Sequence, residues 1–373
     1  MLQISAAIAR LLILAIVAWK NRSTPSADSA RLRRSFFYCF LDFRISSCYA
    51  TWMIAPDLSI VIVSYNVREY LRECLNSVPA ACGELSVEVF VTDNASRDES
   101  AALVEHEFPN VHLTVNSENL GMARAVNQML PQARGRYILL LNPDAVMPKD
   151  ALARLVAIAD RWPEVGVVGP LIRHPANGEP LITFCSLPTW RDAFFLYTIA
   201  RPFLRRLSAP AWQPTFDYPS ASGQLIGACF LIRRELFKEI GGLDQGYFLF
   251  YEDTEYCRRA LDAGWKILYT REVEVFHHQG KSTAQEMPDW IWALHLKGLL
   301  RYLRTEKSAG TWFYGTVFKV LFFCKILFQS VESMVKIPAY NLTKRVDAVS
   351  RHRRRLRHNA WLMGEVLRRR LFI

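Results

Sequence analysis

The chain has 373 residues, of which 51% are hydrophobic and 22% are charged. A chain of this length and composition can bury a large core, which excludes a mainly disordered protein. Its eight cysteines are scattered and form no C-x-x-C pair. This spacing argues against a zinc site or a disulfide framework, and it fits a reduced, cytosolic setting.

The formal net charge of +11 is concentrated at the two ends of the chain. Residues 343–373 have a net charge of +8 and residues 1–52 one of +5, so the remainder is at −2. The basic run Arg351–Arg357 could bind nucleic acid, but apolar residues such as Trp361 and Phe372 follow it. Basic and apolar side chains together favour an anionic membrane surface as the partner, with a solvated cationic tail as the alternative.

The first part of the chain lacks the pattern of a folded domain. Ile4–Trp19 is apolar but is interrupted by Arg10; it is short for a membrane span and has no clear cleavage site. An organised pattern begins only after Met53. We therefore expect residues 1–52 to be an appendage or an upstream mis-assigned start, with an N-terminal membrane anchor as the alternative.

From Leu58 onward, short apolar runs alternate with segments of helical spacing. Strands are predicted at 58–65, 87–92, 111–115, 137–141 and 165–169, and helices around 71–78, 101–107, 121–132 and 150–162. This alternation predicts an α/β fold whose mostly parallel central sheet is covered by helices on both faces.

Residues 170–220 interrupt this pattern with eight prolines, and we interpret them as a long excursion over the sheet. The pattern resumes after them. A strand is predicted at 226–233, a helix after Glu252, and two further strands at 266–269 and 273–277.

Acidic and amide side chains follow three of these apolar segments. Asp93 ends the second strand, Asn142 and Asp144 follow the fourth, and Glu252 and Asp253 open a later helix. Each position also has a purely structural explanation, as a turn residue or as an acid in a first helical turn. Because ligands in α/β folds gather at the carboxyl ends of strands, the three positions together predict a polar site there.

The motifs around these residues resemble those of glycosyltransferase family 2, and within it the rhamnosyltransferase-like branch. The likeness covers roughly residues 57–305. Its carriers, in the family's order, are 59–66 (SIVIVSYN), 92–98 (TDNASRD), 119–127 (NLGMARAVN), 140–144 (LLNPD), 227–234 (GACFLIRR), 251–255 (YEDTE) and 277–282 (HHQGKS). The resemblance implies the nucleotide-sugar-binding GT-A fold and the transfer of a sugar, with L-rhamnose from dTDP-rhamnose as one candidate donor.

The resemblance also implies roles for individual residues. Asp253 would be the general base that takes the proton from the attacking acceptor hydroxyl, with inversion at the anomeric carbon, and Glu252 would position this base or the acceptor. Asp93 would accept a hydrogen bond from the pyrimidine N–H of the donor, and Arg124 could reach its diphosphate. Gly121 would let the backbone approach the ligand. The other donor-binding residues implied are Ser64, Tyr65, Asn66, Asn119 and Asn142.

A divalent metal site is implied at Asn142-Pro-Asp144, which occupies the place of the family's Asp-x-Asp motif. Asp144 would be a ligand of Mg²⁺ or Mn²⁺, and His277, in the slot of the His-x-x-Gly-x-Ser motif, would complete the metal shell or contact the diphosphate. The sequence departs from the motif because its first acid is the uncharged Asn142, which puts tight metal binding in question.

The C-terminal part is predicted to associate with membranes. Residues 311–330 are apolar and aromatic, but Lys319 and Lys325 would lie about 120° apart around a helix, so neither a clean span nor a clean amphipathic stripe results. An interfacial or re-entrant helix is expected, with a transmembrane helix as the alternative. We expect a GT-A domain at 53–305 and a membrane-associating region at 306–373. The enzyme would be peripheral or weakly anchored on the cytoplasmic face of the cell membrane, acting on a glycan or polyprenyl-linked glycan.

Three other function classes are alternatives. A catalytically inactive GT-A-fold scaffold at the membrane surface would fit Asn142 but not the retained acids. A processive polysaccharide synthase would carry a Gln-x-x-Arg-Trp motif, which the chain lacks. A nucleic-acid-binding enzyme has only the basic tail in its favour, so nucleic acid is not an expected partner.

Overall fold

The structure is a computed structural model that describes residues 55–198, 220–282, 288–305, 311–342 and 346–367. The appendage predicted at 1–52 lies outside the described residues, as does most of the second half of the proline-rich segment. Both therefore remain predictions.

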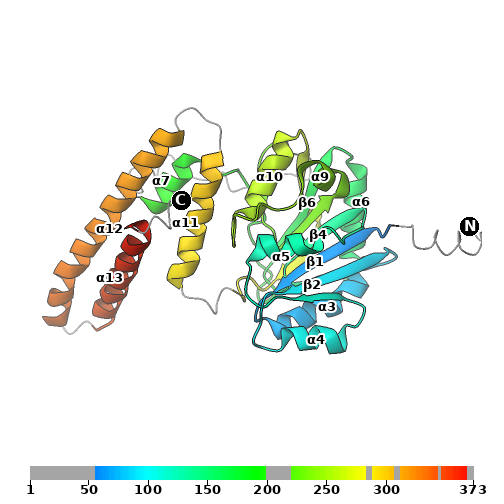
Figure 1. The fold of residues 1–373 in the computed structure, drawn as a ribbon, viewed down its shortest axis with the longest axis horizontal. Helices are drawn as coiled ribbons and strands as arrows, with labels where there is room; N and C mark the ends of the chain where they lie inside the picture. Colours follow the sequence, from blue (N-terminus) through cyan, green and yellow to red (C-terminus); the bar gives the residue numbers. More distant parts are fainter. Residues whose placement is uncertain (1–54, 199–219, 283–287, 306–310, 343–345, 368–373) are drawn as a thin grey trace, which may run out of the picture. The chain divides into compact units, whose positions relative to one another are not determined.

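The described core is an eight-stranded mixed sheet, and the predicted α/β fold with a mostly parallel sheet is confirmed (Figure 1). In spatial order its strands are β3 (His112–Val115), β2 (Val87–Asp93), β1 (Leu58–Ser64), β4 (Tyr137–Leu141), β9 (Cys229–Arg233), β6 (Val165–Arg173), β10 (Lys266–His277) and β5 (Ala145–Val146). Only β9 and β5 run antiparallel to their neighbours. The carboxyl ends of β1, β4 and β10 therefore share one edge of the sheet.

Helices cover both faces of this sheet because alternate strand residues point to opposite sides. Helices α3 (Arg68–Cys82), α4 (Ser100–Glu107) and α6 (Ala151–Arg161) bury their apolar faces with Ile60 and Ile62 of β1. Helices α5 (Met122–Met129), α9 (Arg234–Ile240) and α10 (Glu252–Asp262) bury theirs with Val61 and Val63. Strand β1 is buried along its whole length, as its continuous apolar run predicts.

The end of the sheet differs from the sequence prediction in two places. The strands predicted at 266–269 and 273–277 are one strand, β10, whose register against β6 shifts between Thr270 and Glu274. Pro170 of β6 pairs next to this shift, and a proline has no N–H to donate to the ladder. Strand β6 also continues to Arg173, beyond the predicted end of that strand.

The proline-rich segment is more ordered than a plain excursion. Strand β7 (Phe184–Cys185) pairs with β8 (Gln224–Leu225), and Trp190–Tyr197 forms helix α7. This helix begins with a capping box between Thr189 and Asp192, which is a local signal for a helix start in the sequence.

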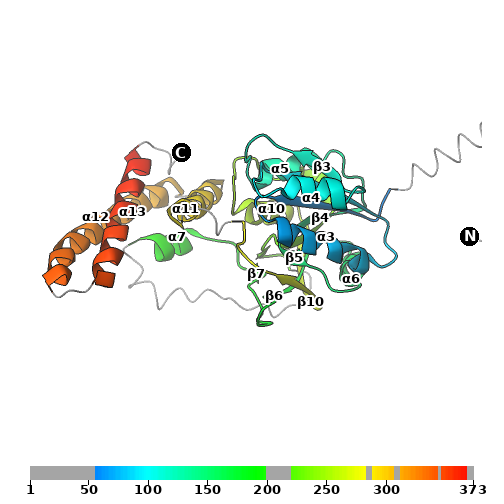
Figure 2. The ribbon, with the colours of Figure 1, turned by 90° about the horizontal axis from the view of Figure 1, so that it is seen from below.

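A third apolar cluster joins α7 to the C-terminal helices α11 (Pro288–Thr305), α12 (Thr311–Leu342) and α13 (Val346–Leu367). Helices α12 and α13 run side by side as a hairpin (Figures 1 and 2), held by hydrogen bonds such as that from Asn359 Nδ2 to the Ile326 carbonyl at 3.3 Å. Among the described helices, none is both long and apolar enough to cross a membrane.

Candidate active site

A cavity of about 900 Å³ opens where the carboxyl ends of the sheet strands meet α10, α7 and α11. Its polar side is lined by residues at strand ends and by the first turn of α10. Its apolar side is lined by Phe195 and Leu196 of α7, by Phe248 and by Trp290 of α11. The predicted site residues that line it are Tyr65, Asn119, Gly121, Asn142, Asp144, Glu252, Asp253 and His277.

An unusual turn directly precedes the two carboxylates at the start of helix α10. Phe250 and Tyr251 have φ of 70° and 71°, the left-handed region that side chains other than glycine rarely adopt. Gly298 of α11 packs against this turn, where a Cβ would lie 2.9 Å from the Phe250 carbonyl oxygen and 2.8 Å from the Tyr251 ring. Close packing by α11 therefore holds the backbone that aims Glu252 and Asp253 into the cavity.

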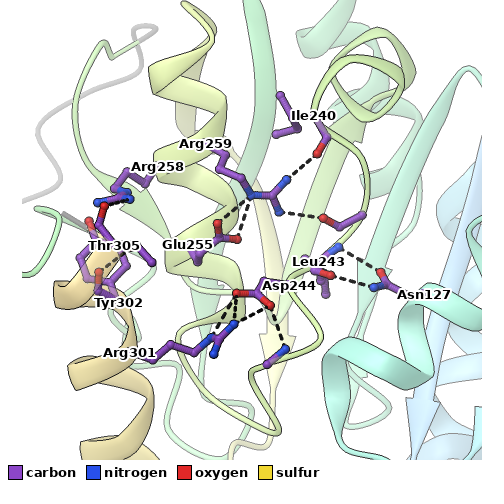
Figure 3. Close-up of polar contacts among 12 residues, drawn as sticks. Asn127, Ile240, Leu243, Asp244, Glu255, Arg258, Arg259, Arg301, Tyr302 and Thr305 are labelled. Atoms are coloured by element: carbon purple, nitrogen blue, oxygen red, sulfur yellow. Dashed lines mark hydrogen bonds and ion pairs between the residues drawn. The ribbon is translucent and has the colours of Figure 1, made fainter. Parts of the chain in front are cut away.

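The loop that leads into this turn is held by a polar network (Figure 3). The guanidinium of Arg259 bonds the Glu255 carboxylate at 2.7 Å and the carbonyl oxygens of Ile240 and Gly242 at 2.6 and 2.7 Å. Nearby, Arg301 of α11 forms an ion pair of 2.8 Å with Asp244 of the same loop. These contacts connect α10, the loop and α11, so the conformation of the turn at Phe250 and Tyr251 does not depend on its own sequence alone.

Asp253 accepts two backbone hydrogen bonds, from Gly227 N to Oδ2 at 2.8 Å and from Thr254 N to Oδ1 at 2.7 Å. Burial raises the pKa of Asp253 above its ordinary value, and these N–H donors oppose the rise. Burial, and secondly the charge of Asp253, raises the pKa of its neighbour Glu252 to about 8. The Oε2 atom of Glu252 is buried without a partner in the described structure.

These contacts divide the roles of the two carboxyl groups. Two like charges this close and this buried do not both form readily at neutral pH. The N–H donors favour the charge on Asp253, so Glu252 is the member of the pair that keeps a proton.

Asp144 and His277 meet although 133 residues separate them. The short strand β5 pairs with the end of β10, placing Ala145 opposite His277, and this brings Asp144 Oδ1 to 2.9 Å from His277 Nε2. Asn142 Nδ2 lies 3.2 Å from the same ring nitrogen. Burial alone would raise the pKa of Asp144, but the bond to His277 and its charge lower the pKa below its ordinary value, so the carboxylate is ionised.

The donor set here, one carboxylate, one imidazole and one amide, suits Mg²⁺ or Mn²⁺ bound partly by substrate phosphates. In the part of the chain that the structure describes, no group of three or more His, Cys, Asp or Glu side chains is placed to hold a metal ion by itself.

The structure places four predicted donor residues, Ser64, Asn66, Asp93 and Arg124, outside the set that lines the cavity. Asp93 and Ser64 are opposite each other in the β1–β2 ladder, and each has a buried oxygen without a partner in the described structure. The other oxygen of Asp93 accepts the Ser96 N–H at 2.9 Å, as the turn interpretation predicted. Asn66 Oδ1 accepts the Arg97 N–H at 2.7 Å.

The adjacent Asn94 lines the cavity and was not predicted. It is almost fully buried, and its side chain bonds the Gly121 carbonyl at 3.3 Å and the Asn116 amide at 2.9 Å. Its position directly after Asp93 in the motif TDNASRD was the available signal.

Gly121 and Arg124 lie differently from what we expected. Gly121 has a φ of 80°, and a Cβ there would lie 2.4 Å from the Phe248 carbonyl oxygen. That oxygen accepts the Met122 N–H at 2.7 Å, so the close approach is to the chain's own backbone as well as to the cavity. Arg124 is exposed and lines a separate small hollow with Asn127 and Gln245.

Two further residues that line the cavity were not predicted: His295, which had no signal in the sequence, and Lys281, which lies in the motif 277–282. His295 of α11 stacks on Phe250 with ring centroids 3.7 Å apart, and burial lowers the pKa of His295. Lys281, in the loop after β10, also lines the cavity. Helix α11 looks like an ordinary apolar helix in sequence, because only its packing decides which of its residues face a cavity.

Comparisons with known proteins identify the family to which this chain is similar. A family model described as "Glycosyltransferase like family 2" matches residues 56–294, which include every described strand. An N-acetylglucosaminyl-diphospho-decaprenol L-rhamnosyltransferase of Mycobacterium tuberculosis is 30% identical over 269 residues, covering 68% of this chain and 86% of that protein.

More distant similarities were also found. Rhamnosyltransferase WbbL of Escherichia coli is 23% identical over 257 residues, covering 66% of this chain and 93% of that protein. A solved mannosyltransferase, PcManGT from Pyrobaculum calidifontis in complex with GDP-Man and Mn²⁺, aligns at 17% identity with a TM-score of 0.48. That alignment covers 84% of this chain and 87% of that chain, and it is too distant to inform the site.

Proposed function

The chain belongs to the glycosyltransferase-like family 2, and we propose that it is an inverting enzyme that transfers a sugar from a nucleotide diphosphate donor to a hydroxyl of a glycan or lipid-linked glycan in cell-surface polysaccharide synthesis. One observation carries the proposal: a single cavity is lined by both the buried pair Glu252–Asp253 and the ionised Asp144 beside His277. The names of two similar proteins, both rhamnosyltransferases, make L-rhamnose the first sugar to test, with dTDP-rhamnose as the donor that the family resemblance implies.

In the proposed reaction the acceptor hydroxyl oxygen attacks the anomeric carbon and forms the new glycosidic bond. The bond from that carbon to the phosphate oxygen breaks, and its electron pair leaves with the nucleoside diphosphate. Asp253 takes the proton of the attacking hydroxyl, and a base of this kind contributes ~10²–10⁴ in rate. Glu252, which keeps its proton at neutral pH, would donate a hydrogen bond from its unpartnered side and position the acceptor.

Asp144, His277 and the Asn142 amide would hold a Mg²⁺ or Mn²⁺ ion. When bound, such an ion stabilises the negative charge on the diphosphate. The hydrogen bond between Asp144 and His277 lowers the pKa of Asp144, which leaves this carboxylate available to a cation.

We also propose that the enzyme docks on the cytoplasmic face of the cell membrane through α12. One face of this helix packs inward through Phe318, Phe322 and Ile326. The other face is exposed and apolar, with Val320, Phe323, Leu327, Val331 and Met334 following the three-to-four residue spacing of one helical face. An exposed apolar face of this length is typical of a helix that lies in a membrane interface.

Helix α13 adds positive charge beside this face. It packs along α12 through a bond between His352 and Ser333 at 3.0 Å, and Arg353, Arg354 and Arg357 remain exposed. Each basic residue near an anionic surface contributes about 1 kcal/mol, less as salt increases. This charge makes an anionic lipid surface the proposed occupant of the apolar face.

For the domain organisation, we propose that catalysis needs only residues from Met53 onward, with 1–52 dispensable. The GT-A domain would comprise 53–305, and 306–373 would associate with the membrane. A chain that starts at Met53 should fold and hydrolyse donor as fast as the full chain.

The function is tested by incubating the purified full chain with dTDP-rhamnose and a panel of UDP-, GDP- and dTDP-sugars in Mg²⁺ and measuring release of the nucleoside diphosphate. Hydrolysis of one donor, accelerated by a polyprenyl diphosphate-linked glycan, is expected. Inertness toward every donor, with and without acceptor, would instead support the inactive scaffold.

A further inference from the structure

The cavity has more acidic than basic side chains, although we propose that it binds a nucleotide diphosphate. Four carboxyl groups line it: Asp144, Asp192, Glu252 and Asp253. Among the described lining residues, Lys281 is the only lysine or arginine. A bound diphosphate brings further negative charge, so this single cation is a notable feature of the cavity.

The local backbone places Lys281 next to the proposed cation site. Gln279 and Gly280 both have positive φ, 53° and 74°, and turn the chain back over the end of β10. As a result the Lys281 N–H lies 3.5 Å from Asp144 Oδ2. This long contact places the backbone of Lys281 beside the carboxylate that is expected to face the diphosphate.

The side chain of Lys281 is not engaged in an ion pair within the described residues. Its ammonium lies 5.4 Å from the centre of the Tyr70 ring, over the ring face. A contact of this kind holds an ammonium through the ring's electrons and leaves its N–H groups available as donors. The side chain is half-buried, so it reaches the cavity without being fixed by a carboxylate.

We propose that Lys281 binds the diphosphate of the nucleotide-sugar donor and stabilises the nucleoside diphosphate as it departs. This inference rests on the proposed function. As the bond between the anomeric carbon and the phosphate oxygen breaks, the electron pair stays on that oxygen, and the ammonium donates hydrogen bonds to the phosphate and keeps its proton. The proton of the acceptor still goes to Asp253.

The uncharged Asn142 gives a reason for a lysine that binds the diphosphate at this position. A cation held by Asp144 has one carboxylate where the family's motif has two, so the protein supplies less negative charge to retain it. A fixed ammonium beside Asp144 provides diphosphate binding that does not depend on the metal. Lysine is a strong donor to phosphate as a point charge.

The test measures binding rather than turnover. UDP, dTDP and GDP are each titrated calorimetrically into the full chain, in Mg²⁺ and in EDTA, together with the matching nucleosides. For the nucleotide that binds, Lys281→Ala should weaken affinity about tenfold or more in both conditions, and Lys281→Arg should recover most of the loss. The affinity for the nucleoside, which has no phosphate, should be unchanged.

Two further variants separate this role from a structural one. Lys238→Ala removes an exposed lysine of α9 outside the cavity and should change nothing. Tyr70→Leu removes the ring under the ammonium; a loss as large as that of Lys281→Ala would mean that Lys281 only holds the loop, and would overturn the inference.

The binding results also distinguish the two proposals. Unchanged diphosphate affinity in Lys281→Ala, or an equal loss for the nucleoside, would overturn the inference alone. Failure of the unmodified chain to bind any of the three nucleotides would overturn the proposed function and the inference with it.

Discussion

The α/β body and the helical part differ in where their polar and apolar side chains lie. In the body, apolar residues are buried on both faces of the sheet, and polar residues line the cavity at the strand ends. The helical part, α7 with α11, α12 and α13, shares an apolar core and still exposes an apolar face on α12. We therefore propose that the body binds the donor, and that the helices contact the acceptor and the membrane.

The largest expected effect tests the body. Asp253→Asn should reduce transfer by ~10²–10⁴, because the amide cannot take the acceptor proton, and should leave nucleotide binding intact. Steady-state kinetics and calorimetry measure the two quantities. Transfer within about threefold of the unmodified chain would remove Asp253 from the role of base.

The second effect concerns the cation site. Asp144→Ala should lower activity by about 10² or more, and Asn142→Ala by less, because only the carboxylate carries charge. Removal of divalent ions by EDTA should lower activity, and added Mg²⁺ or Mn²⁺ should restore it. Full activity in excess EDTA would contradict a role for the metal and leave the diphosphate to cationic side chains.

The third effect tests the exposed face of the helical part. Changing Phe323, Leu327 and Phe328 to serine should reduce sedimentation with anionic phosphatidylglycerol vesicles by about tenfold, because each large side chain loses apolar burial. Donor hydrolysis without vesicles should not change.

The matched control for the membrane face changes exposed apolar residues of the body, Val115 and Ile182, to serine. It should leave vesicle binding unaltered. A shift from dimer to monomer in light scattering of the α12 variant, with equal vesicle binding, would identify the face as a contact between copies of the chain.

The fourth effect tests whether the helical part also builds the acceptor site. Trp290 lines the cavity and packs edge-on against Phe248, with centroids 5.5 Å apart. Trp290→Ala should raise the KM for the acceptor by about tenfold with little change for the donor. Trp312→Ala, at a tryptophan that is 82% exposed on α12, serves as control. An equal rise in the donor KM would contradict the division between body and helices.

The smallest effect is on stability. When folding raises the pKa of a carboxyl group, the group's contribution to stability is fully present below its ordinary pKa and is lost as the pH rises through the raised pKa. For Glu252 this loss extends up to about pH 8. Glu252→Gln should therefore raise Tm by about 2–4 °C at pH 8 relative to its effect at pH 5. Asp262→Asn, at the exposed end of the same helix, should show no such difference. An equal Tm change at both pH values would contradict a raised pKa.

Much of the body was predictable because its elements are specified locally. The strand at 137–141 was predicted with its observed bounds, and β1, β2 and α6 within about one residue at each end. Continuous apolar runs specify buried strands without reference to the rest of the chain. The polar residues that follow such strands reach the cavity because strand direction alone places them at one edge.

The sequence by itself therefore determined the α/β class, the family and the strand-end acids. Tertiary structure decided what depends on pairing between distant segments. Asp144 meets His277 only because β5 pairs with β10, and Gly121 is needed because Phe248 packs on it. Helix α12 is a further example. Its two lysines interrupt the apolar pattern in the sequence, so the pattern does not reveal that two of its faces are apolar. Packing against α7, α11 and α13 determined which face is buried and which remains exposed.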